Sequence, residues 1–486
     1  MSLTAAMITA RSSLATRSAE IAVTSENVAN VNNRNYSRQT AVVSSTTTAS
    51  GSTVYVSDVT RATNQAATTE VMRSGSVAVA SGSYATLLDS IGSIEGSPLY
   101  GGIATSLGQL ESDLQAYAND PANQVMGQKV LETAYASVNE INTASQNIQD
   151  ARAEADASMA NAVTNINDIL ERFDSLNREI ISGTASGENV NAQLDEREQL
   201  IRELSEEIGI DVQYRDNNDA VIYTDSGVTL YETSPREVTF TAQPFYAAST
   251  VGNAIYVDGI SVAGPGALKP VEGGAIAGYA KMRDDTGVTL QEQLDELAFA
   301  LIDAFKEVDQ TSSGLPDQAG LFTDGPNAAI PTSTVGLAAT LSVNTAAASN
   351  VETIRDGGMN IGGTAGDAYV VNRDSVDGYT DHLNGLVRAL SEPDLTATGF
   401  NTDISIVDFA TNSASWYSAE RSRATEAAIL NSSAYNVSLD TLSNSTGVNI
   451  DLEMSRLLDI ENAYSASAQL MTTVDSMFKE LLSVVR

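Results

Sequence analysis

The chain has 486 residues, with 62 acidic and 26 basic side chains, so its formal net charge at pH 7 is −36. A surface this acidic repels nucleic acid, and the length predicts two to four domains. The absence of cysteine excludes disulfides, thiolate metal sites and cysteine nucleophiles. No apolar run approaches the roughly 18 residues of a membrane span, and no cleavable signal peptide is evident, so we predict no membrane insertion.

A first helix is predicted over residues 2–29, because large apolar side chains recur there every seven residues. Ala and Ser fill the positions between them, so a partner helix could approach closely. The stripe predicts either an ordinary amphipathic helix docked on its own domain or one half of a helix–helix interface. Its members are Met7, Leu14, Ile21 and Val28. A polar loop crowded with Asn, NVANVNNRNYSRQT, ends this helix.

A second heptad pattern predicts one continuous helix over residues 128–182, which contain neither Pro nor Gly. At the standard rise per residue such a helix extends roughly 80 Å and forms a rod. Ser145 and Arg152 interrupt its apolar frame. A further helical pattern over residues 407–442 is predicted to pack antiparallel on this rod.

Between residues 209 and 280 the apolar period changes to two, which predicts a β-rich region with DNND, at 216–219, as a hairpin turn. Another helix is predicted over residues 291–309. From 314 to 392 Gly, Ala, Thr and Asn dominate, and short strands and loops are expected.

A last helix is predicted from residue 450 to the end of the chain, again with a strict seven-residue stripe. Neither terminal helix can bury its stripe alone, since isolated helices are marginal in water. We therefore expect the two helices to pair with each other, with other subunits, or both. The expected interface on this helix consists of Ile450, Met454, Leu457, Tyr464, Met471, Phe478 and Leu482, and Val485 continues it.

Together these patterns predict a multidomain α+β protein. Its N- and C-terminal regions form an elongated, coiled-coil-like helical bundle, into which a β-rich outer domain is inserted. The predicted parts are residues 1–73 (helix, Asn-rich loop and strand), 74–209 (the rod), 210–290 (the β-rich domain), 291–403 (a helix and a Gly/Thr/Ala-rich region) and 404–486 (the C-terminal helices, with the last helix in 447–486).

Residues with chemistry for catalysis or metal binding are scarce. The single histidine, His382, has no cysteine near which to form a metal cluster and no marked serine partner. The glycines of residues 357–367 lack the lysine of a phosphate loop, and the acidic turn at 216–219 lacks EF-hand spacing. We predict no enzyme activity, no cofactor and no metal.

Both ends of the chain resemble the axial proteins of the bacterial flagellum, the family of rod, hook and hook-associated proteins. SENVANVNNRNYSRQ is similar to the family's loop, and STGVNIDLEMSRLLDIENAYSASAQL to its tail. The helix NAQLDEREQLIRELSEEIGI resembles the hook-associated branch. Four residues, 32–35, replace the family's Thr-Pro-Gly turn, and Asn tolerates the left-handed conformation that such a turn uses. The loop motif is carried by Asn27, Asn30, Tyr36, Ser37 and Arg38.

The resemblance implies a structural protein that self-assembles at the hook tip as the junction between hook and filament. Its terminal helices would form the inner tube and would be largely disordered in the monomer. It implies flagellar type III export without a cleaved signal, to an extracellular location. The implied partners are further copies of the chain, the hook protein, the next hook-associated protein toward the filament, and an export chaperone on the C-terminal helix.

Two alternatives remain open from the sequence. One is another axial protein, such as a hook or filament-type subunit. The other is a secreted acidic coiled-coil adhesin with no tubular assembly, whose termini would be ordered in the monomer.

Overall fold

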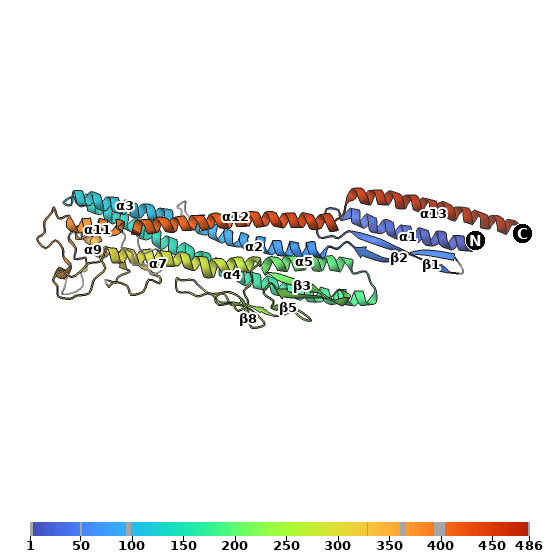
Figure 1. Ribbon diagram of the computed structural model, residues 1–486, viewed down its shortest axis with the longest axis horizontal. Helices are drawn as coiled ribbons and strands as arrows, with labels where there is room; N and C mark the ends of the chain where they lie inside the picture. The colour runs from blue at the N-terminus through green and yellow to red at the C-terminus, as the bar shows by residue number, and fades with distance from the viewer. Residues whose placement is uncertain are drawn as a thin grey trace.

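The computed structural model describes residues 3–48, 51–93, 99–327, 329–359, 366–392 and 404–484. The molecule is elongated and mostly helical, with small antiparallel sheets, and both chain ends lie at the same end (Figure 1). We divide it into a terminal unit, residues 3–61 and 447–484, and a body, residues 62–446. This is a multidomain α+β architecture.

The terminal unit is built from two helices and one hairpin. Helix α1 (Leu3–Ala29) packs against α13 (Ile450–Val484), and the hairpin of β1 (Gln39–Thr48) and β2 (Gly51–Arg61) lies against α1. The sequence predicted only one strand here, because QTAVVSSTTT in β1 is dominated by Ser and Thr rather than by large apolar residues.

Hydroxyl groups of α1 attach it to the hairpin. Thr9 Oγ1 donates to Ser52 O at 2.7 Å and Thr16 Oγ1 donates to Val54 O at 2.9 Å. Ser12 Oγ accepts a bond from Val54 N at 3.2 Å. Edge strands present unpaired backbone groups, so these side chains cover the edge of β2 that faces α1.

The body is organised along one long helix, α4 (Gln124–Ser186), of 63 residues. It begins where Asn123 Oδ1 accepts a bond from Val125 N and ends at Gly187, whose φ of 78° suits glycine. The predicted helix over 128–182 is thereby confirmed and extends four residues further at each end. The helices around it are α2 (Gln65–Ser93), α3 (Leu99–Asn119), α5 (Asn191–Glu207), α6 (Gly274–Lys281) and α7 (Gly287–Ala304).

Helix α12 (Ile406–Thr446) confirms the expected helix over 407–442 but not its partner. It packs mainly against α2 and α3 and does not run along α4 as predicted. The reason is that α3, α5, α6 and α7 already cover the apolar rows of α4.

Two apolar cores lie along the body. One joins α3, the first half of α4, α7 and α12, and the other joins the second half of α4 to α5 and the β-rich region. Among the described residues, no side chain of the terminal unit belongs to either core.

The β-rich region consists of two three-stranded antiparallel sheets, with strand orders β3-β4-β5 and β6-β7-β8. The predicted hairpin turn at 216–219 is confirmed, with Asn217 and Asn218 at φ values of 56° and 58°. The strands are β3 (Ile210–Tyr214), β4 (Ala220–Thr224), β5 (Thr229–Tyr231), β6 (Val238–Thr239), β7 (Ile255–Val257) and β8 (Ile260–Ala263).

The return from the β-rich region to the helices passes through a π-helical segment, Met282–Thr286, between α6 and α7. Within 314–392, where short strands and loops were expected, short helices accompany the strands. The described elements are β9 (Phe322–Asp324), α8 (Leu337–Thr340), β10 (Leu341–Val343), α9 (Thr345–Ser349), α10 (Thr353–Asp356), a 3-10 helix (Gly366–Tyr369) and α11 (Asp381–Ser391). The boundaries expected after residues 73 and 290 fall inside α2 and α7.

Candidate functional site

The face of α13 that packs on α1 differs from the predicted stripe. The buried side chains of α13 are Glu453, Ile460, Ser467 and Val474, again spaced by seven residues. Ser13 Oγ lies 3.0 Å from Ser467 Oγ across this contact. A row that contains Glu and Ser escapes a search for apolar periodicity, which explains why the sequence did not indicate it.

The predicted stripe residues lie beside this contact or away from it, and none of those described is buried. Val485 lies outside the described residues. Half-buried positions are Leu14, Ile21, Val28, Leu457, Met471 and Phe478, and exposed positions are Met7, Ile450, Met454, Tyr464 and Leu482. A single copy therefore leaves an apolar surface on α13 uncovered.

Exposed apolar side chains concentrate in the terminal unit. Among the described residues, 27 large apolar side chains are exposed, and 13 of them lie in this unit of under 100 residues. The unit is also nearly neutral, with nine acidic and seven basic residues, whereas residues 62–446 carry 53 acidic and 18 basic ones. Low charge together with exposed apolar area is typical of an interaction surface.

Asn27 is the centre of the loop motif. It is 1% exposed, and its Nδ2 donates to Gln39 O at 2.8 Å and to Glu453 Oε2 at 3.1 Å. Its Oδ1 accepts from Tyr36 OH at 2.8 Å and from Gln39 N at 2.9 Å. One amide thus ties the end of α1 to the start of β1 and to α13. Burial, together with nearby carboxylates including Glu453, raises the pKa of Tyr36.

Helix α5 attaches the terminal unit to the body through polar contacts. Asp195 Oδ2 accepts from Ser37 N at 3.1 Å, and its Oδ1 accepts from Arg61 Nη1 at 2.9 Å. Arg61 also pairs with Glu198. Asn191 Nδ2 donates to Val59 O at 2.6 Å. We call this set of contacts, together with those of the loop at 30–38, the joint.

The loop at 30–38 completes the joint. Asn35 Nδ2 donates to Gln199 Oε1 at 3.0 Å, and Arg202 donates to Asn35 Oδ1 at 2.7 Å. Arg38 N donates to Thr446 O at 2.8 Å, next to the break between α12 and α13. Residues 32–35 form their turn without any left-handed backbone, so the conformation suggested by the sequence is not used. The side chain of Asn30, which is half-buried, donates to Glu26 O and accepts a bond from Asn33 Nδ2.

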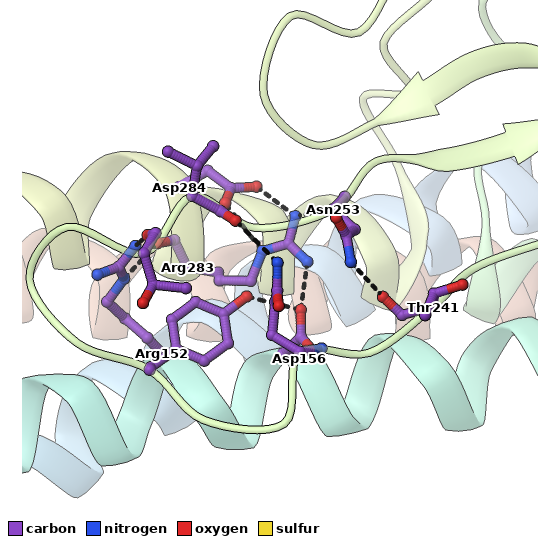
Figure 2. A network of polar contacts seen from close by, with 10 residues as sticks. Arg152, Asp156, Thr241, Asn253, Arg283 and Asp284 are labelled. Atoms are coloured by element: carbon purple, nitrogen blue, oxygen red, sulfur yellow. Dashed lines mark hydrogen bonds and ion pairs between the residues drawn. The ribbon is translucent and has the colours of Figure 1, made fainter.

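A second polar cluster, inside the body, holds the π-helical segment against α4 (Figure 2). Arg283 Nη1 donates to Asp156 Oδ1 at 2.6 Å, and Arg283 also pairs with Asp284. Burial opposes the charge of Arg283, but these carboxylates raise its pKa. Asp156 also accepts bonds from Gln243 N and from Tyr246 OH, each at 2.7 Å.

Arg152 is the neighbouring charge of this cluster and one of the two residues that interrupted the heptad frame. It donates to the carbonyl oxygens of Arg283, Ala247 and Thr250. Burial lowers its pKa. The other interruption, Ser145, donates to Gln291 on α7 at 3.0 Å. The two interruptions of the heptad frame therefore mark polar contacts of α4 to other elements. The groups of the cluster bond to other groups of the same chain, so its role is structural.

The residues that the sequence analysis weighed for metal binding and catalysis can now be placed. In the parts of the chain that the structure describes, no group of three or more His, Asp and Glu side chains could hold a metal ion. His382 is half-buried at the start of α11, where burial lowers its pKa. Over the same residues, no helix combines the length and hydropathy of a membrane span.

Comparisons with known proteins agree with this geometry. Residues 97–322 match the family described as the flagellar hook-associated protein FlgK helical domain, and residues 442–484 match the C-terminal family of the flagellar basal body rod FlgEFG proteins. These two regions lie in the body and across the break into α13. Over residues 97–322 the chain is therefore similar to the FlgK-type hook-associated proteins, and over residues 442–484 to the rod proteins, of the bacterial flagellum.

Individual relatives cover part of the chain. It is 27% identical over 311 residues to flagellar hook-associated protein 1 of Salmonella typhimurium and 26% identical over 309 residues to that of Escherichia coli. Each alignment covers 61% of this chain and 55% of the relative, so the chain spans about half the length of these relatives. The flagellar hook junction protein FlgK from Burkholderia pseudomallei aligns with a TM-score of 0.42 and 22% identity over 53% of this chain and 46% of that one.

Proposed function

We propose that this chain assembles at the tip of the hook as the junction between hook and filament, with α1 and α13 of many copies forming an inner tube. One observation carries the proposal: the two family matches occur in a chain whose α13 leaves every described residue of its predicted apolar stripe exposed or half-buried. A tube supplies further copies on every side of such a helix. Burial at about 25 cal/mol per Å² is then available to each copy.

Charge supports the same arrangement. Nine acids and seven bases in the terminal unit allow close approach of copies, whereas the net charge of the body repels its neighbours. The body therefore belongs on the outside, where salt screens it. A hook or filament-type subunit is disfavoured because residues 97–322 match the hook-associated family. A tube-free adhesin would leave the exposed row of α13 without a partner.

The proposal also includes the route by which the chain is exported and the proteins that it contacts. We expect export through the flagellar type III route without a cleaved signal, and an extracellular location. The neighbours are further copies, the hook protein on one side and the next hook-associated protein on the other. An export chaperone would cover the α13 stripe before assembly, because that surface is otherwise open to aggregation.

Deletion of residues 450–486 tests the proposal. The deleted chain should fail to incorporate, and flagellin should appear in the medium while hooks remain intact. Hydrogen exchange of the body should be unchanged, because both apolar cores lie outside the deleted segment. A deleted chain that still joined hook and filament would refute the inner-tube role.

Hydrogen exchange of the purified full chain gives a second test. Few large apolar side chains of α1 and α13 are buried in one copy, so we propose that assembly supplies most of the burial that orders them. In the monomer, residues 3–28 and 450–484 should exchange faster than the apolar cores of the body, because the terminal unit is only marginally stable without neighbours. Slow exchange there without any neighbour would support the adhesin alternative.

A further inference from the structure

The stem of the body carries an apolar surface that none of the observations above uses. We define the stem as α2 together with residues 418–446 of α12, which pack on each other. The outer face of α12 exposes Ile429, Leu430 and Val437 by 62%, 61% and 65%. The inner face bonds to α2, for example through Asn431 Nδ2 to Ser81 Oγ at 3.1 Å. These three aliphatic side chains, which we call the stem patch, are therefore mostly exposed in one copy.

A groove runs beside the patch. It has a volume of about 930 Å³ and lies between α2 and α12, with Ile429 and Leu430 on its wall. Small side chains form much of its lining, so another chain can approach the two backbones closely. The ion pair of Asp89 and Arg421 in its lining is internally neutral. The small lining residues include Ala85, Thr86, Gly92, Ser418, Ser422 and Thr425.

Charge indicates which partner fits. The stem has five acidic and three basic residues, while the rest of the body has 48 acidic and 15 basic ones. The low net charge of the terminal unit is therefore shared by the stem, which adjoins it. A second copy can meet this surface without the repulsion that its acidic outer parts would cause.

Continuity points to the same partner. Helix α12 leads into α13 through only three residues, 447–449, and Ile450 and Leu452 on α13 are exposed by 46% and 60%. The exposed apolar surface therefore resumes immediately beyond the break. We propose that the stem patch and its groove are a second self-assembly surface, occupied by another copy of this chain. This inference rests on the proposed function, which assigns the α13 surface to contacts between copies.

Single-cysteine cross-linking tests the stem surface, because the chain has no native cysteine. Full-length Leu430→Cys would be labelled, in purified hook–filament structures, with a thiol-reactive photo-cross-linker. Two matched variants accompany it: Leu470→Cys on α13, exposed by 60%, and Leu268→Cys in the β-rich region, exposed by 76%. We expect dimers of this chain from Leu430→Cys and Leu470→Cys, and none from Leu268→Cys.

The outcomes separate the two proposals. Dimers from Leu470→Cys but none from Leu430→Cys would overturn the stem surface and leave the inner tube intact. No dimers from either variant would overturn both. A Leu430→Cys product that contained another flagellar protein would overturn the choice of a second copy. In cells, Leu430→Glu should reduce incorporation at least tenfold with unchanged hydrogen exchange in α2 and α12, whereas Leu268→Glu should incorporate normally.

Discussion

The terminal unit and the body are held together by different forces. Apolar cores run along the body and enclose whole rows of α4, whereas the terminal unit has no residue in either core among those described. Its buried side chains include hydroxyl groups, the amide of Asn27 and the carboxylates of Glu20 and Glu453, with few large apolar ones such as Ile460 and Val474. The two units therefore differ in where their large apolar side chains lie: many are buried in the cores of the body, and most are exposed or half-buried in the terminal unit. The following substitutions should affect the two units by different amounts.

Arg283→Ala should have the largest effect on stability. It leaves Asp156, which is 1% exposed, and Asp284 without their guanidinium partner. Removing one partner of a buried ion pair costs about 3–5 kcal/mol, so the body should unfold at markedly lower denaturant concentration. Arg236→Ala, which breaks an exposed pair with Asp258, is the control and should cost under about 1 kcal/mol. Equal effects of the two variants would show that the cluster in Figure 2 does not stabilise the body.

Asp113→Asn should cost about 1–3 kcal/mol at neutral pH. Asp113 is 3% exposed and accepts bonds from Lys129, Gln109 and Thr133 at 2.7–2.8 Å. Burial alone would raise the pKa of Asp113, but these three partners lower it below 3.8.

A lowered pKa in the folded state means that stability from Asp113 is complete above pH 3.8 and is lost as pH falls through the folded value. The difference between parent and Asp113→Asn should therefore shrink in acid, as urea unfolding at several pH values would show. A constant difference between pH 7 and pH 2 would contradict this assignment.

Asn27→Ala should cost about 1–3 kcal/mol, confined to the terminal unit. It removes the amide that bonds to Gln39, Tyr36 and Glu453, and leaves the Glu453 carboxylate buried. Faster hydrogen exchange is expected at the end of α1 and the start of α13, with the body unaffected. Asn32→Ala, at an exposed position of the same loop, should change neither. Faster exchange throughout α4 would mean that the two units unfold together.

Leu470→Glu should have the smallest effect on the stability of one copy, within about 0.5 kcal/mol, because Leu470 is 60% exposed. Its effect on incorporation should be large if neighbours cover α13. The matched variant Ile460→Glu, at a position 5% exposed toward α1, should disturb the monomer itself. The comparison between units would fail if Leu470→Glu destabilised the monomer as much as Ile460→Glu.

Sequence periodicity predicted the parts of the fold that depend on apolar burial within one helix. The heptads of α4 located that helix to within four residues at each end, and alternation located the β-rich region. Periodicity could not identify the partner of α12, because several helices compete for the same rows of α4. It also missed β1, whose Ser and Thr side chains carry no apolar alternation.

The sequence indicated only part of the candidate site, because the rest depends on polar contacts between distant segments. The loop motif was visible as an Asn-rich stretch, but no sequence pattern indicated that Asn27 would contact Glu453, which lies 426 positions away. The contact row of α13 includes Glu453 and Ser467, which look like solvent positions until their partners are known. Polar burial depends on geometry between distant segments, so it becomes visible only in three dimensions.

The joint has a mechanical consequence. When the terminal unit tilts, bonds such as Ser37 N to Asp195 and Arg61 to Glu198 can be replaced by hydrogen bonds to water. Opening an apolar core instead exposes apolar surface to water, which is unfavourable. A torque along the molecule should therefore be taken up between α5 and the loop at 30–38, before either core yields. The joint is therefore the position at which the terminal unit should rotate most easily relative to the body.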